Sequence, residues 1–225
     1  MRARAQFIML SPGGQILTCM KRSELGVLGY MLVYIREWIM ASHKRPAKVL
    51  AMLSRRYQEA AIQLGLRHVP RVFDEHHGTI SSMHYRTLAE VVEVIAADVI
   101  PPASNMGRVI ATTVAWYWAC RALSFTPADI TALGHKTEAM RAAWETLDTP
   151  EWRATLRKPK KKKDKKASKF PSNPVLETPK FHRAVEHCVD YVREWGPLEY
   201  ITTETSEAMH KPLKAYFRTY VVCCA

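Results

Sequence analysis

The stretch SNMGRVIATTVAWYWACRAL, residues 104–123, decides the fold class because it is apolar on most faces of a helix. It begins with Ser104, a residue type that caps helix starts. Its apolar positions include Val109, Ile110, Val114, Trp116, Tyr117 and Trp118. A helix that is apolar all round is buried by its neighbours. Three consecutive aromatic residues point to different faces, so we interpret them as core residues and not as a base-stacking platform.

Apolar residues repeat at spacings of three and four on both sides of this stretch, which indicates amphipathic helices. We expect helices to begin near Ser23, between Pro46 and Leu50, at Ser81 or Ser82, at Thr126–Pro127, near Phe181 and near Thr202. Pro46, Gly65, Pro101 and Gly196 limit helix ends. No segment alternates convincingly like a strand, so the sequence predicts an all-α or mainly α fold, an irregular helical array.

Composition divides the chain into segments. Residues 1–22 lack periodicity and are predicted to be weakly ordered, whereas residues 23–149 form a helical domain. Residues 150–178 combine a lysine run with four prolines, and we interpret them as a basic linker because they have little apolar surface to bury. C-terminal helices over residues 179–219 and a tail over residues 220–225 follow.

The strong positive charge of the chain is local. The formal charge is +12, but residues 158–169, KPKKKKDKKASK, carry +7 and the other 213 residues only +5. The candidate DNA-binding residues are Lys158, Lys160, Lys161, Lys162, Lys163, Lys165 and Lys166. Three interpretations stay open: binding of DNA phosphates without sequence readout, a nuclear localisation signal, or a solvated linker.

Other motifs exclude several classes of protein. The five cysteines are irregularly spaced with no C-x-x-C pair, which favours a reducing compartment over a disulfide framework or a zinc site. The apolar stretch at the N-terminus is too short for a signal peptide, and no apolar run reaches the ~20 residues of a membrane span. No nucleotide-binding or hydrolase motif is present. We therefore expect an intracellular, soluble protein without a small-molecule substrate.

Three histidines near Cys188 are candidate metal ligands. His182 and His187 are five residues apart, which rotates them away from each other on an α-helix. We interpret them, with His210, as core or capping residues. The sequence thus predicts no metal site.

The C-terminal stretch PKFHRAVEHCVDYVREWGPLEYITTETSEAMHKPLKAYFR, residues 179–218, resembles the C-terminal block of Plavaka-type DNA transposases, a CACTA-like group. That block starts with Pro-Lys-Phe-His and continues through a helix ending in Ile-Arg-x-x-Gly. A Thr-Glu-x-x-Glu-x-x-His segment follows, here from Thr203 to His210. The resemblance extends more loosely upstream and covers roughly residues 25–219.

The resemblance implies the insertion and C-terminal helices of an RNase H-like enzyme, in which two Asp and one Glu hold two Mg²⁺ ions. Glu207, and less so Glu204, match the third acid. The first Asp has no counterpart here, and only Glu24 lies where the second belongs. We therefore expect a truncated, catalytically inactive transposase-derived protein from a mobile element, without a cofactor of its own and with residual non-specific DNA binding. The alternatives are a helical protein-interaction module without a nucleic-acid role, and an active metal nuclease using Glu24, Glu204 and Glu207.

Overall fold

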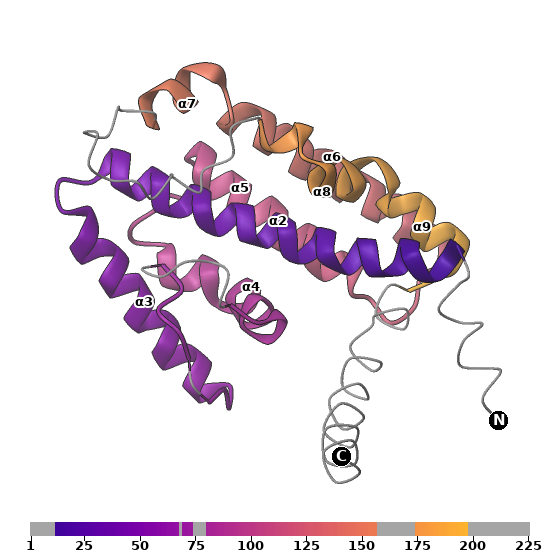
Figure 1. Cartoon of the computed structure of the whole chain (residues 1–225), viewed down its shortest axis with the longest axis horizontal. Coiled ribbons are helices and arrows are strands. Elements are labelled where there is room, and N and C mark those ends of the chain that lie inside the picture. Colours follow the sequence, from indigo (N-terminus) through magenta and orange to yellow (C-terminus); the bar gives the residue numbers. More distant parts are fainter. Residues whose placement is uncertain (1–11, 68, 74–79, 157–173, 198–225) are drawn as a thin grey trace, which may run out of the picture.

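The computed structural model describes residues 12–67, 69–73, 80–156 and 174–197, which form helices and contain no strand (Figure 1). The all-α prediction is confirmed for this part of the chain. The main elements are α2 (Pro12–Ser42), α3 (Pro46–Gln63), α4 (Ser82–Ala96), α5 (Asn105–Cys120), α6 (Pro127–Leu147) and α7 (Pro150–Leu156). The C-terminal elements are η2 (Val175–Glu177), α8 (Pro179–His182), the π-helical turn η3 (Arg183–His187) and α9 (Cys188–Trp195).

The long helix α2 organises the molecule. In Figure 1, α3 and α4 lie on one side of α2, and α6 lies with α8 and α9 on the other. Helix α5 packs against α2, α4 and α6. Trp116 and Tyr117 of α5 are buried and Trp118 is half-buried, so the prediction of a central, core-packed helix is confirmed. The indole of Trp144 in α6 donates to Thr113 Oγ1 of α5 at 3.0 Å, which satisfies a buried polar pair.

The helix ends follow the capping residues read from the sequence. Ser104 Oγ accepts a hydrogen bond from the Gly107 amide at 3.0 Å, and Thr126 forms a capping box with Asp129 at the start of α6. Helix α3 is followed by Gly65 at φ +84° and α9 by Gly196 at φ +80°, a backbone region that favours glycine. No helix in the described part is long and apolar enough to cross a membrane.

Two boundaries differ from those expected from the sequence. Helix α2 begins at Pro12 and not near Ser23. Residues 13–22 have no apolar stripe, so periodicity did not predict that they are helical. They also contain no proline, the residue that would interrupt a helix there. The segment interpreted as a linker is ordered at both ends, where α7 and η2 pack against the fold. Periodicity did not reveal α7 because it spans only seven residues.

A buried polar cluster holds these two ends in place. Asp148, just beyond α6, accepts hydrogen bonds from Tyr34 Oη at 2.7 Å and from the Val175 amide at 2.7 Å. Arg153 of α7 donates to both carboxylate oxygens of Asp148, at 3.0 and 3.2 Å. Trp152 stacks on the Tyr34 ring with centroids 5.1 Å apart. One carboxylate therefore joins α2, α7 and the start of the C-terminal segment.

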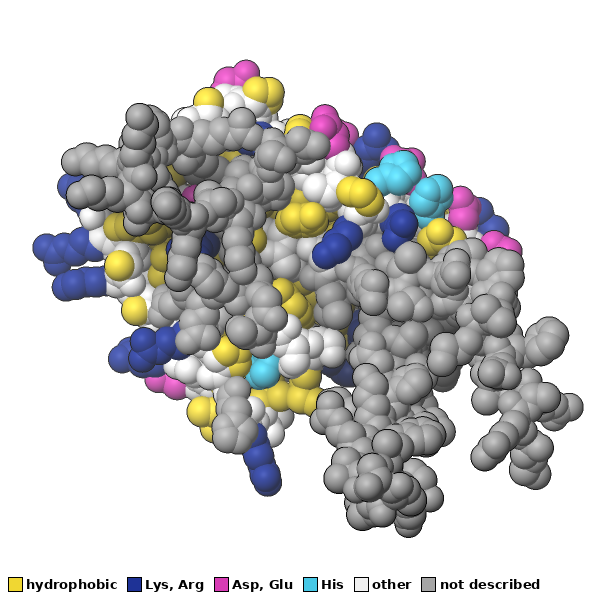
Figure 2. All heavy atoms as spheres, viewed as in Figure 1, with side chains coloured by type: hydrophobic (Ala, Val, Ile, Leu, Met, Phe, Trp, Pro, Cys, Tyr) yellow, Lys and Arg dark blue, Asp and Glu magenta, His cyan; other side chains and the backbone are white. Residues whose placement is uncertain are grey.

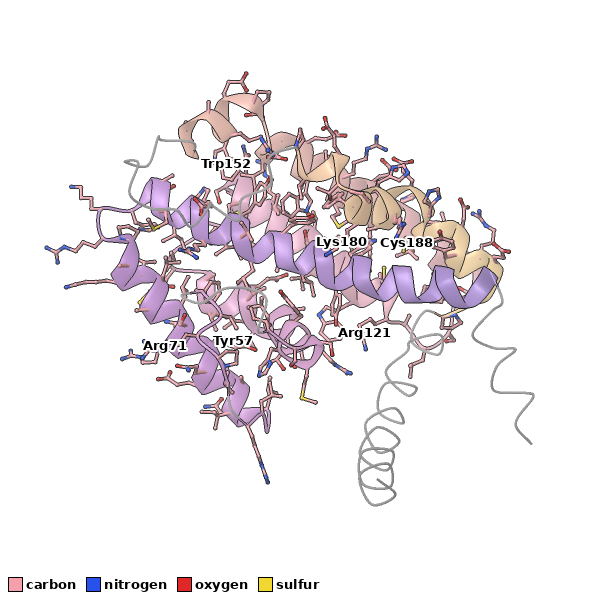
Figure 3. The ribbon with its side chains drawn as sticks, in the orientation of Figure 1. Tyr57, Arg71, Arg121, Trp152, Lys180 and Cys188 are labelled. Atoms are coloured by element: carbon pink, nitrogen blue, oxygen red, sulfur yellow. The ribbon has the colours of Figure 1, made fainter. Side chains whose placement is uncertain are left out.

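The C-terminal elements belong to the same core as the helical domain. Phe181, Ala184, Val185, Cys188 and Val192 are buried, and α8 packs along α2. Gly26 of α2 makes this approach close, since a Cβ there would lie 2.5 Å from Lys180 Cδ. Figure 3 shows Lys180 and Cys188 beside α2, on the opposite side from α3.

Candidate nucleic-acid interface

The candidate catalytic and DNA-binding residues named from the sequence lie outside the described side chains. Glu204, Glu207 and the lysines from Lys158 to Lys166 fall in residues 198–225 and 157–173, which the structure does not describe. Glu24 belongs to helix α2, but the structure does not describe its side chain. The metal-ligand and lysine-run hypotheses therefore stay predictions.

Charge is unevenly distributed over the described helices. Residues 36–73 hold eight Lys and Arg against two Glu, a formal charge of +6. Residues 126–155 hold three Lys and Arg against five Asp and Glu, and residues 174–197 hold three against four. Figure 2 shows Lys and Arg side chains gathered at the end of the molecule where α2 turns into α3. The described part is thus basic at the α2–α3 end and mildly acidic over α6 to α9.

The exposed cations from the α2–α3 turn, along α3 and on the segment that follows α3 form what we call the basic face. Its exposed residues are Lys44, Arg45, Lys48, Arg55, Arg67 and Arg71. Lys44 and Arg45 occupy the turn between α2 and α3. Lys48 and Arg55 are seven residues apart, about two helical turns, so they share one side of α3. That side is opposite Leu53 and Tyr57, which are buried.

The chain after α3 brings a further cation back to this helix. The side-chain amide of Gln58 donates to the Val69 carbonyl at 3.0 Å, and the Phe73 amide donates to Ser54 Oγ at 3.3 Å. Residues 69–73 therefore run back along α3, with Val72 and Phe73 buried as anchors. Arg71 lies between these two attachments and is exposed beside α3 (Figure 3).

Among the described residues, most of the basic face has no acidic partner. Arg55 lies 3.5 Å from Glu59, and both side chains are well exposed. The other five residues of the face form no salt bridge with a described residue. An exposed pair such as Arg55–Glu59 contributes little stability and exchanges readily for another partner. Within the part of the chain that the structure describes, five of the six cations are therefore left without an acidic partner.

Arg56 differs from the basic face although it is the next residue after Arg55. Its guanidinium donates to both carboxylate oxygens of Asp98, at 2.5 and 2.9 Å, and to the Ile95 carbonyl at 2.9 Å. Hydrogen bonding to Arg56 lowers the pKa of the Asp98 carboxyl. Arg56 thus joins α3 to the end of α4 and is excluded from the face.

The start of α3 adds to the positive potential. Its first turn contains Lys48 and no acid, and no side chain caps its amides. The N-terminal end of a helix carries a partial positive charge, which here is not offset by a carboxylate. Phosphate groups bind favourably to such helix starts when cations are nearby.

The lysine run is attached close to the same end of the molecule. Undescribed residues 157–173 join the described fold at Leu156 of α7 and at Pro174 before η2. Both attachment points lie close to residues that bond to Asp148, namely Arg153 of α7 and Val175 of η2. Asp148 is in turn bonded to Tyr34, which lies eight residues before the end of α2.

The basic face was not among the sites predicted from the sequence. The charge outside the lysine run is small when it is summed over 213 residues, because the acids of the later helices cancel the cations of the earlier ones. The excess of Lys and Arg within residues 36–73 was the signal that would have revealed the face.

The structure also corrects the prediction for the histidines. His182 and His187 do not diverge: their ring centroids lie 5.2 Å apart. His182 is exposed and His187 half-buried, so neither is a core residue. The α-helical spacing does not apply because residues Arg183–His187 form a π-helical turn.

Comparisons with protein-family models, with curated proteins and with solved structures find no match to this chain. The residues and their arrangement are therefore the basis for a functional proposal.

Proposed function

We propose that this chain is the helical part of a Plavaka-type transposase and binds the phosphate backbone of nucleic acid without cleaving it. The observation that supports binding most strongly is the basic face, on which five exposed cations have no described acidic partner. The family origin is supported by the Pro-Lys-Phe-His to Thr-Glu-x-x-Glu-x-x-His pattern of residues 179–210.

The chemistry of the face favours the backbone over the bases. Lys and Arg neutralise phosphates and release condensed counterions, which supplies affinity that is independent of sequence. Sequence readout requires contacts to base edges from an element placed in a groove. The cations here lie along the exposed side of α3 and on two loops, a spread that suits successive phosphates. A nuclear location would accompany such a role if the lysine run acts as a targeting signal.

The alternative of a protein-interaction module has less support. Among the described residues, the large exposed apolar residues are Met40, Ile62, Leu64, Met83, Val94 and Leu123. They are distributed over α2, the end of α3, α4 and the loop after α5. Single exposed apolar residues are ordinary on a soluble surface, whereas interaction sites need a contiguous patch.

The binding proposal is tested by fluorescence anisotropy with a labelled DNA duplex of arbitrary sequence. The logarithm of the association constant should fall linearly with the logarithm of the salt concentration between about 50 and 200 mM. A second duplex of unrelated sequence should bind equally well. An affinity that does not change with salt would rule out binding through phosphates.

The family origin is tested separately from DNA binding. If the chain derives from such an element, the genomic sequence upstream should encode the strand region with the two missing aspartates. An upstream sequence without any such region, in several independent genomic copies, would count against the assignment while leaving the binding result intact.

A further inference from the structure

A π-helical turn places two histidines next to each other on the surface. His182 and His187 are five positions apart, and the turn Arg183–His187 replaces the regular α-helical repeat between them. In a π-helical turn the backbone bonds residue i to residue i+5, so side chains five apart lie on the same face. The two imidazole rings are accordingly 5.2 Å apart between centroids.

The hydrophobic core holds this turn rigidly while the rings face outward. Phe181, Ala184, Val185 and Cys188 are buried, so they fix the backbone on both sides of each histidine. His182 is exposed, and Figure 2 shows His side chains side by side on the surface over α8 and α9. Ligands supported by a packed element are better oriented than ligands on a loop.

We propose that His182 and His187 form a binding site for a divalent transition-metal ion such as Zn²⁺ or Ni²⁺. Imidazole nitrogen is a preferred ligand for these ions. An ion about 2.0–2.1 Å from one nitrogen of each ring places the two centroids roughly 5–6 Å apart, because each centroid lies about 1 Å behind its nitrogen. The observed separation of 5.2 Å falls in that range.

The site is open, with two protein ligands. Within the described residues no group of three or more His, Cys, Asp and Glu side chains could hold a metal ion, so water or an external ligand completes the coordination. Two acids of the same segment form exposed ion pairs, Glu186 with Arg141 at 3.1 Å and Asp190 with Arg193 at 2.8 Å. Tyr191 borders the pair, with its ring 5.9 Å from that of His187.

Packing of one ring edge against the other would produce the same separation without any ligand. The two explanations differ in how the histidines respond to metal, because packing requires neither ring to have a nitrogen available. Replacing either histidine with glutamine keeps a polar side chain of similar size but removes the imidazole.

The test is a calorimetric titration of Ni²⁺ into the full chain at neutral pH. The wild-type protein should bind one ion at this pair, and His182→Gln and His187→Gln should each abolish that binding phase. His135→Gln is the matched control, because His135 is an exposed histidine on α6 and should leave the phase unchanged. Circular dichroism should show that all three variants keep the wild-type helical content.

A second measurement identifies the ligands directly. Long-range ¹H–¹⁵N spectra of the imidazole nitrogens should show the His182 and His187 signals shifting together on addition of Zn²⁺, with the His135 signal unmoved. The proposal is overturned if both glutamine variants bind Ni²⁺ like the wild type, or if only one of the two signals responds. Neither result depends on DNA binding, so this site and the proposed function can fail independently.

Discussion

Replacing Asp148 with asparagine should lower the free energy of unfolding far more than removing the carboxylate of an exposed ion pair would. The Asp148 side chain is 1% exposed and Arg153 is 7% exposed, so the pair is shielded from water. Asp148→Asn leaves the Arg153 guanidinium buried without a counter-charge, a change that typically costs about 3–5 kcal/mol. The carboxylate also accepts from Tyr34 and the Val175 amide, and one amide oxygen cannot satisfy all three donors.

Urea unfolding monitored by tryptophan fluorescence measures this effect, because Trp144 and Trp152 both lie against Tyr34. With an ordinary denaturant dependence, a destabilisation of that size lowers the midpoint by roughly 2 M. The exposed pair Asp190–Arg193 is the matched control, and Asp190→Asn should cost less than about 0.5 kcal/mol. A cost within about 1 kcal/mol for Asp148→Asn would refute the view that this carboxylate holds α7 and the C-terminal segment to α2.

Three further perturbations test the fold. Thr126→Ala removes the capping box of α6 and should cost about 1 kcal/mol by thermal unfolding, whereas an unchanged stability would contradict the cap. Gly107→Ala adds a Cβ that meets the Pro101 carbonyl oxygen and should lower the free energy of unfolding, measured with urea, by about 1–3 kcal/mol. Unchanged stability would mean that the Pro101 loop can move away from the added Cβ. Burial raises the pKa of the Tyr34 and Tyr57 phenols, so the folded state binds these protons more tightly. Stability should therefore be level below about pH 9 and fall above about pH 10, by at most about 1.4 kcal/mol per pH unit for each tyrosine, and Tyr34→Phe should reduce that slope.

Local signals predicted most of the helices. Ser104, Thr126, Gly65 and Gly196 each set a boundary through backbone chemistry that does not depend on distant residues. The apolar residues Leu50, Leu53 and Tyr57 and the apolar character of residues 104–123 likewise report which faces are buried, whereas Leu64 of the same stripe is exposed. Such features are readable because they repeat at the helical period.

The candidate sites depend on features that a local pattern does not contain. Asp148 and Val175 are 27 residues apart, and only the folded chain shows that they bond. The π-helical turn before Cys188 changed the relation of two histidines that the regular period separates. The basic face combines a turn, a helix and a returning segment, and Arg71 joins it only because residues 69–73 pack back on α3.

The central claim is that the basic face contacts nucleic-acid phosphates. The most direct measurement compares the salt dependence of duplex binding by the wild type with that of the triple variant Lys44→Gln, Arg45→Gln, Lys48→Gln. If the three cations neutralise phosphates, the slope of log association constant against log salt should decrease by up to about 0.9 for each phosphate that is no longer neutralised. The matched control replaces Lys136, Lys180 and Arg183, exposed cations on α6 to η3, with glutamine and should leave the slope unchanged. Equal slopes for the triple variant and the wild type would contradict the claim.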